Sequence, residues 1–169
     1  MKVEFTLNGK LTEVEAPGSM TLLTLLREQL GLTGTKCGCD TGDCGICSIL
    51  LDGKLVYSCV LSVSQLKGHQ VITIEGLQSP DGRLSDLQES FLRNGAVQCG
   101  YCIPSMILAG EALLLKNPDP TRDEIKTAIS NILCRCTGYQ QIIDSIQEAA
   151  HKRRSLPKNQ ARKDVESAS

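Results

Sequence analysis

Tryptophan is absent from this 169-residue sequence, and all aromatic residues together make up only 3% of it. With so few aromatic rings, any hydrophobic core must be built from aliphatic side chains. Stretches such as LLTLLREQL and AGEALLLKN supply them, and the hydrophobic share of 41% suits one medium-sized domain or two small ones. We therefore expect a core of modest size made mainly of leucine, isoleucine and valine.

Strong net charge and long apolar runs are also missing. The formal net charge is -1 at pH 7, which gives no overall attraction to nucleic acids or to membranes. No run of 18 apolar residues occurs, and the N-terminal MKVEFTLNGKLTEVE alternates polar and apolar residues instead of forming a signal peptide. These absences predict a cytoplasmic protein without a membrane or nucleic-acid partner.

Cysteine, by contrast, is abundant, with nine residues in the chain. Without an export signal these thiols are expected to stay reduced, and reduced thiols at close spacing bind metals or take part in redox chemistry. The odd number of cysteines also argues, weakly, against a framework of structural disulfides.

The N-terminal half has the pattern of a small α+β domain. Two hairpins are predicted at Asn8-Gly9 and Asp52-Gly53, a further strand at HQVITIEG, and a helix at SMTLLTLLREQLG with Ser19 or Thr21 as its cap. The turn-rich segment LQSPDGR then breaks the pattern. We place the first domain at residues 1–76.

Four amphipathic stretches follow and predict a compact helical bundle at residues 77–153. They are LSDLQESFLRNG, PSMILAGEALLLKN, TRDEIKTAISNIL and TGYQQIIDSIQEAAHKRR. The remaining residues, 154–169, are basic and are expected to form a solvated tail, with a partner-docking arm as the alternative.

The segment TKCGCDTGDCGIC raises the question of which thiols act together. Three of its four cysteines have the C-x4-C-x2-C spacing of plant-type 2Fe-2S proteins, which a more distant cysteine completes: Cys39, Cys44, Cys47 and Cys59. A four-thiolate cluster is anionic, so the loop must wrap it closely and direct backbone N–H groups at the sulfurs. Gly38, Gly42 and Gly45 allow the backbone geometry and the close approach that this wrapping needs.

A second set of thiols lies in the helical half, at QCGYC and CRC, and comprises Cys99, Cys102, Cys134 and Cys136. Both pairs fall at predicted helix boundaries, where helix N-terminal N–H groups favour a bound anion such as a cluster. The unit C-G-x-C occurs in both halves, and its spacing suggests that its two sulfurs meet one iron. Cys37 is left over, and we expect it to be a small buried apolar residue.

Other uses of the thiols are less consistent with the spacing. Zinc sites usually pair one C-x2-C unit with another, whereas here the partners are C-x4-C and C-x-C. A redox dithiol is expected within a thioredoxin-like βαβ pattern, which surrounds neither C-x-x-C unit. A stand-alone ferredoxin or iron-sulfur sensor and a zinc-stabilised interaction module stay open as alternatives.

Taken together, GLTGTKCGCDTGDCGIC, QCGYCIPSM and CRCTGY closely resemble the iron-sulfur subunit of the molybdenum hydroxylases, the group of xanthine dehydrogenase, aldehyde oxidoreductase and carbon monoxide dehydrogenase. The similarity covers roughly residues 2–150. It implies an N-terminal β-grasp, plant-ferredoxin-like domain and a C-terminal four-helix bundle, each holding one 2Fe-2S cluster.

The resemblance also implies roles for residues and partners. Cys39, Cys44, Cys47 and Cys59 would hold the cluster nearer the flavin, and the other four ligands the cluster nearer molybdenum, with Gln98 and Cys136 lying against the pterin. Partner subunits would carry molybdopterin, as the cytosine dinucleotide, and FAD, in a dimer of heterotrimers. This chain would conduct electrons to FAD and bind no substrate itself. For the substrate of the complex we expect xanthine or a related purine.

Two residues depart from the family pattern. Ser105 stands where glycine is usual in C-x-P-G, and Ile132 stands where asparagine is usual in N-L-C-R-C. Neither is a ligand position. We expect both to alter hydrogen bonds around the pterin-side cluster and hence its potential.

Overall fold

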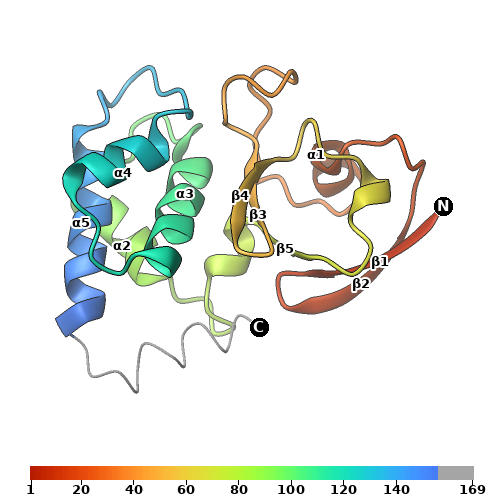
Figure 1. The fold of residues 1–169 in the computed structure, drawn as a ribbon, viewed down its shortest axis with the longest axis horizontal. Coiled ribbons are helices and arrows are strands. Elements are labelled where there is room, and N and C mark those ends of the chain that lie inside the picture. Colours follow the sequence, from red (N-terminus) through yellow and green to blue (C-terminus); the bar gives the residue numbers. More distant parts are fainter. Residues whose placement is uncertain (156–169) are drawn as a thin grey trace.

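The computed structural model describes residues 1–155 and confirms the predicted α+β class. Figure 1 shows the strands and the larger helices as two groups side by side, with α3 beside β3 and β4. The strands are β1 Lys2–Leu7, β2 Lys10–Glu15, β3 Ser48–Leu51, β4 Lys54–Tyr57 and β5 Gln70–Ile72. The α-helices are α1 Leu22–Thr24, α2 Asp86–Arg93, α3 Ile103–Lys116, α4 Arg122–Ile129 and α5 Gln140–Ser155.

Both predicted hairpins are confirmed. The turns at Asn8-Gly9 and Asp52-Gly53 have positive φ at both central residues, between 48° and 76°, as two-residue hairpin turns with native strand twist require. The sheet order is β2-β1-β5-β3-β4, with β1 and β5 parallel and the other pairs antiparallel. The second hairpin therefore lies at the edge of the sheet that faces the helices.

The helix predicted after the first hairpin is present but short. It starts at α1, where the Thr21 side chain accepts the N–H of Thr24 at 3.2 Å, and continues as a π-helical segment, Leu25–Gln29. Gly31, with a φ of 66°, ends it. Its buried leucines pack into the sheet core, which consists mainly of Val3, Phe5, Leu22, Leu25, Leu26, Ile49, Val63, Leu66 and Val71. The cysteine loop thus begins from a fixed point beside the sheet.

The four helices predicted in the second half are confirmed as α2 to α5. Capping boxes begin two of them, formed by Ser85 with Gln88 and by Thr121 with Glu124. The basic residues 152–154, which span the predicted boundary between bundle and tail, lie on the last turn of α5. Residues 156–169, most of the predicted tail, lie outside the described residues.

Helix α3 joins the two halves. It is buried on several sides because it packs on β3 and β4 as well as on α2, α4 and α5. Leu108 and Ala112 of α3 form a buried cluster with Leu50 of β3. Within residues 1–155, no helix has both the length and the apolar character needed to cross a bilayer.

A largely buried ion-pair network fastens the C-terminal end of α5. Arg153 contacts Asp86 of α2 and Glu111 of α3, each at 2.7 Å. Burial would raise the pKa of Asp86, but the Arg153 hydrogen bonds and charge hold that pKa below its usual value. The guanidinium therefore compensates two carboxylates that would otherwise be desolvated without a partner.

This network predicts that two single substitutions in the helical half, each removing one cationic side chain, lower the free energy of unfolding by different amounts. Arg153→Ala leaves Asp86 and Glu111 unpaired, and we expect it to lower the free energy of unfolding by about 3 kcal/mol. Lys126→Ala, which removes an exposed pair with Asp123, should lower it by less than about 1 kcal/mol. Urea unfolding of both variants measures the difference, and equal losses would contradict the role given to Arg153.

Candidate functional site

The first set of thiols lies between the π-helical segment and the end of the second hairpin. Cys39, Cys44 and Cys47 are in the loop before β3, and Cys59 follows β4 by two residues. Ser58 closes the hairpin, because its N–H and its hydroxyl donate to the Cys47 carbonyl at 3.2 and 2.7 Å. The hairpin thereby returns Cys59 to the loop, as expected from the sequence.

Backbone N–H groups converge on the sulfurs of this set. Cys39 Sγ accepts the N–H groups of Thr41, Asp43 and Cys44, each at 3.4 Å. The Thr41 side chain, followed by these N–H groups, lowers the pKa of Cys39 to about 6. The loop thus stabilises a thiolate at Cys39, which is the state in which cysteine binds metals.

Deeper thiols in the same set are affected mainly by burial. Burial raises the pKa of Cys59 to about 12, and its contact with Cys47 adds to the shift. Burial also raises the pKa of Cys44, although the N–H of Ile46 opposes the change. Without a cation these buried thiols stay protonated, so a bound metal is needed to draw negative charge into this site.

The second set lies where two interhelical loops meet. Cys99 and Cys102 precede α3, and Cys134 and Cys136 lie in the loop between α4 and α5. Cys136 Sγ is 3.5 Å from Cys99 Sγ and 4.0 Å from Cys134 Sγ. Burial, followed by a hydrogen bond with Cys134, raises the pKa of Cys102 to about 12. All four thiols of this set are therefore neighbours.

Two side chains hold the loop around Cys134. Burial alone would raise the pKa of Cys134, but the hydroxyl and N–H of Thr137 lower it to about 7. The Tyr139 hydroxyl accepts the N–H of Cys134 at 2.8 Å and donates to the Ile132 carbonyl at 3.0 Å. Tyr139 adopts a φ of 68°, an uncommon conformation for a residue with a side chain, to reach this position.

The thiols of both sets meet in pairs. The pairs are Cys39 with Cys44, Cys47 with Cys59, Cys99 with Cys136, and Cys102 with Cys134. These contacts run between a C-G-x-C unit and a thiol outside it, and the expectation that the two thiols of such a unit meet one iron stays a prediction. Among residues 1–155, no three His, Cys, Asp or Glu side chains are arranged to hold a single metal ion.

This pairing fits a cluster of two irons, each bound by two thiolates. Two sulfurs on one tetrahedral metal lie about 3.8 Å apart when the metal–sulfur bonds are about 2.3 Å. The sulfur–sulfur separations of 3.5 Å between Cys99 and Cys136 and 4.0 Å between Cys134 and Cys136 are both close to that distance. When bound, such a cluster would supply one-electron redox chemistry, which no side chain of this chain provides.

Glycines allow the first loop its tight path. Gly42 and Gly45 have φ values of 83° and 70°, and a Cβ atom at Gly38 would lie 2.6 Å from Cys44 Sγ. A Cβ atom at Gly45 would lie 2.4 Å from the carbonyl oxygen of Asn131, close to the second set in sequence. Gly38 and Gly45 therefore allow the close approach, and Gly42 and Gly45 allow the positive φ values.

Hydrogen bonds join the two cysteine loops directly. The N–H of Leu133 donates to the carbonyl of Cys44 at 2.9 Å, and the Tyr101 hydroxyl donates to the carbonyl of Cys37 at 2.6 Å. The Ser105 hydroxyl donates to the carbonyl of Ile46. The sequence carried no signal for these contacts, since each joins residues at least 59 positions apart.

Both departures from the family pattern lie in this region, and both also reach the loop of the first set. The Ser105 side chain is fully buried, and its hydroxyl donates to the Ile46 carbonyl in the loop of the first set, although Ser105 is nearer in sequence to the second set. Ile132 is 1% exposed and lies close to Gly45 of the first loop.

The remaining site residues lie at the surface. Gln98, Cys99 and Cys136 are exposed, beside the exposed apolar side chains of Tyr101 and Leu133. Cys37 is exposed too, so the expectation that it is a small buried apolar residue is wrong. The Tyr101 hydroxyl donates to the backbone carbonyl of Cys37, and this contact does not involve the Cys37 thiol.

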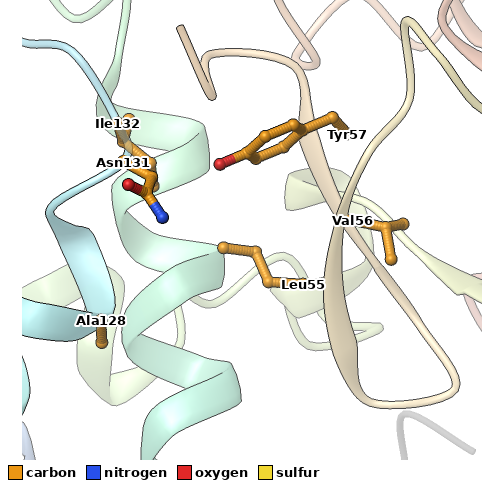
Figure 2. A pocket seen from close by; sticks show the side chains of 6 residues that line it. All are labelled: Leu55, Val56, Tyr57, Ala128, Asn131 and Ile132. Carbon is orange, nitrogen blue, oxygen red and sulfur yellow. The ribbon is translucent and has the colours of Figure 1, made fainter. Parts of the chain in front are cut away.

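A shallow groove of about 200 Å³ lies next to this junction (Figure 2). Leu55 and Tyr57 of β4 point toward the helical half, and the Tyr57 hydroxyl is directed toward Asn131, while Val56 points the other way. Burial, followed by the nearby Cys47 and Cys44, raises the pKa of Tyr57. The lining contains no acidic or basic side chain.

Comparisons with known proteins agree with two cluster-binding regions. The family model described as "2Fe-2S iron-sulfur cluster binding domain" matches residues 5–73, and the one described as "[2Fe-2S] binding domain" matches residues 73–147. The chain is 45% identical to the nicotinate dehydrogenase small FeS subunit of Eubacterium barkeri, over 89% of this chain and 95% of the relative.

Two further proteins extend this likeness. The iron-sulfur-binding subunit of a xanthine dehydrogenase from Escherichia coli is 40% identical, over 85% of this chain and 91% of the relative. The crystal structure of quinoline 2-oxidoreductase from Pseudomonas putida 86 contains a chain with a TM-score of 0.85 and 43% identity. That match covers 90% of this chain and 96% of the other.

The contact of Gly45 with Asn131 predicts a contrast between two glycines of similar φ. Gly53 also has a positive φ, 74°, but nothing lies within 4 Å of an added Cβ atom. Gly53→Ala should lower the free energy of unfolding by about 1–2 kcal/mol, the cost of a left-handed conformation. Gly45→Ala should lower it by more, because the added methyl group also collides with the Asn131 carbonyl.

Urea unfolding of the two variants tests this expectation. Equal losses in both variants would mean that the cysteine loops separate easily and that the close contact at Gly45 is unimportant.

Proposed function

This chain belongs to the family of the iron-sulfur small subunits of molybdenum hydroxylases, and from that premise we propose that it is the electron-transfer subunit of such an enzyme. Electrons would pass from a molybdopterin centre in a partner subunit, through two 2Fe-2S clusters held here, to FAD in another. The chain would be a non-catalytic part of an oxidoreductase complex. The observation that carries the proposal is the pair of four-thiol sets, joined by the hydrogen bond from Leu133 N–H to the Cys44 carbonyl at 2.9 Å.

We assign the ligands as the thiols pair in space. The first cluster would be held by Cys39 with Cys44 and by Cys47 with Cys59, in the first proposed domain, residues 1–76. The second would be held by Cys99 with Cys136 and by Cys102 with Cys134, in the second domain, residues 77–153, whose helices we take to be the four-helix bundle of the family.

The Leu133–Cys44 hydrogen bond matters because Leu133 immediately precedes Cys134 in sequence. One hydrogen bond and a short stretch of backbone therefore separate a proposed ligand of one cluster from a proposed ligand of the other. Such a compact bridge suits transfer of single electrons, since it needs no movement of the chain.

Exposure suggests where partners dock. The second set leaves Cys99 and Cys136 exposed beside Gln98, Tyr101 and Leu133, and exposed apolar side chains around a redox site indicate a surface that another protein covers. We propose that the molybdopterin subunit, carrying the cytosine dinucleotide form, covers this face with Gln98 and Cys136 against the pterin. The FAD subunit would approach the first set, in a dimer of heterotrimers.

The substrate would bind in the molybdopterin subunit. The relatives reported above are named for nicotinate, xanthine and quinoline, all nitrogen-containing aromatic rings. We therefore propose hydroxylation of a compound of this class, and within it xanthine or a related purine remains our specific choice.

The proposal predicts the spectroscopic properties of the purified protein. After reduction, the chain should give two distinct rhombic S = 1/2 EPR signals, and it should co-purify with molybdenum-containing and flavin-containing subunits when these are expressed together. Two signals without any co-purifying subunit would favour a stand-alone ferredoxin or redox sensor. A colourless, zinc-containing protein would contradict both iron-based functions.

The ligand assignment predicts different effects for two neighbouring thiols. Cys39→Ser should abolish one EPR signal and leave the other, because it removes a ligand of the first cluster. Cys37→Ser should leave both signals, because this exposed thiol belongs to neither proposed ligand set. Iron content provides the second measurement, and loss of a cluster in the Cys37 variant would show that the first ligand is misassigned.

A further inference from the structure

The carbonyl groups of residues 44–47, the segment CGIC, all accept hydrogen bonds from outside the segment. The carbonyl of Cys44 accepts the Leu133 N–H at 2.9 Å. Gly45 accepts the Ser48 hydroxyl at 2.7 Å, Cys47 accepts the Ser58 hydroxyl at 2.7 Å, and Ile46 accepts the Ser105 hydroxyl. The next three carbonyls after Cys44 are thus each held by a serine.

These three serines share unusual surroundings. Ser48 lies at the start of β3, Ser58 follows β4, and Ser105 lies in the first turn of α3, and their exposed fractions are 1%, 0% and 0%. Burying a hydroxyl is unfavourable unless it forms a hydrogen bond, and each of these forms one with the same four-residue segment. Three separate elements therefore each place a hydroxyl on the CGIC segment.

The hydrogen bonds fix the direction of the peptide groups. In a trans peptide the C=O and N–H point in opposite directions, so a carbonyl held from one side leaves its N–H facing the other. The Gly45–Ile46 peptide has both ends determined: its carbonyl accepts the Ser48 hydroxyl, and its N–H hydrogen-bonds to the Cys44 thiol. The same rule applies to the Ile46–Cys47 peptide, whose carbonyl accepts the Ser105 hydroxyl. The Cys47–Ser48 peptide held by Ser58 differs, because its N–H donates to the Gly45 carbonyl at 3.3 Å.

From this arrangement we propose that Ser48 and Ser105 are positioning residues that raise the reduction potential of the cluster held by Cys39, Cys44, Cys47 and Cys59. The inference rests on the ligand assignment in the proposed function. Reduction adds one negative charge to a cluster that is already anionic, and N–H dipoles held toward the sulfurs stabilise that extra charge. Each serine maintains this orientation by anchoring the carbonyl at the opposite end of a peptide group.

Ser105 gives the proposal a second consequence. It belongs to the helical half and follows Cys102 by three residues, yet its hydroxyl contacts the loop of the first set. Substitution of Ser105 should therefore change the potential of the first cluster and not that of the second, to which Ser105 is nearer in sequence.

The experiment is an EPR-monitored redox titration of the full chain, in complex with its partner subunits where these co-purify. Ser48→Ala and Ser105→Ala are each compared with the unsubstituted chain, and the Cys39→Ser variant identifies the signal of the first cluster. Each alanine variant should shift the equilibrium of the first cluster toward the oxidised form by threefold to tenfold, with tenfold equal to about 59 mV for one electron.

Matched variants separate positioning from general destabilisation. Ser145→Ala removes a hydroxyl that is equally buried and also donates to a carbonyl, that of Gln141 at 2.6 Å, but inside α5. It should leave both potentials unchanged. Ser→Thr at positions 48 and 105 keeps the hydroxyl and should keep the potential, while Ser105→Gly offers a second removal of the hydroxyl with a smaller residue.

The outcomes distinguish this inference from the proposed function. Two EPR signals with unchanged potentials in the alanine variants would overturn the inference and leave the proposed function standing. Equal shifts of both clusters, or a comparable shift in Ser145→Ala, would likewise overturn it, because the effect would then be general. Absence of both signals in the unsubstituted chain would overturn the proposed function and this inference together.

Discussion

The close contact between Gly45 and the carbonyl oxygen of Asn131 sets how near the two cysteine loops can come. A Cβ atom at Gly45 would lie only 2.4 Å from that oxygen, so the loops touch backbone to backbone. This approach lets the Leu133 N–H reach the Cys44 carbonyl at 2.9 Å. Helix α3 packs on both the sheet and the other helices, and the buried cluster of Leu50, Leu108 and Ala112 joins the two halves that carry these loops. The arrangement of the two thiol sets therefore depends on a junction at which backbone contact is backed by apolar packing.

The two sets differ in how the chain protects them. Cys44, Cys47 and Cys59 are buried, and N–H groups are directed at the sulfurs of their set, whereas Cys99 and Cys136 are exposed. A buried anionic site must be compensated by the chain itself, because water contributes little there. An exposed site can be compensated by solvent or by a partner that covers it. The N–H groups directed at the first set and the solvent exposure of the second are thus two solutions to the same electrostatic problem.

Local rules explain which features could be predicted from the sequence. The Asn-Gly and Asp-Gly turns, the capping boxes and the amphipathic helices depend on residues close together in the chain, and the structure contains each of them. The spacing of the cysteines indicated the two sets for the same reason. Spacing alone does not decide which thiols of a set share an iron, because the path of the loop between them brings thiols of different units together. The burial expected for Cys37 was wrong because that loop passes over the surface, where Tyr101 holds its carbonyl.

Ser105 illustrates why contacts between the halves escape sequence rules. The resemblance marked it as a departure from glycine and suggested an effect on the nearby second set. In the structure its hydroxyl donates to Ile46, 59 residues away, and the side chain is fully buried. Glycine at this position would leave the Ile46 carbonyl without that donor, and an unpaired buried carbonyl is unfavourable by about 1–3 kcal/mol. Serine is the smallest residue that supplies the missing hydroxyl, so the departure is best understood as part of the first loop's hydrogen bonding, although its position in sequence associates it with the second.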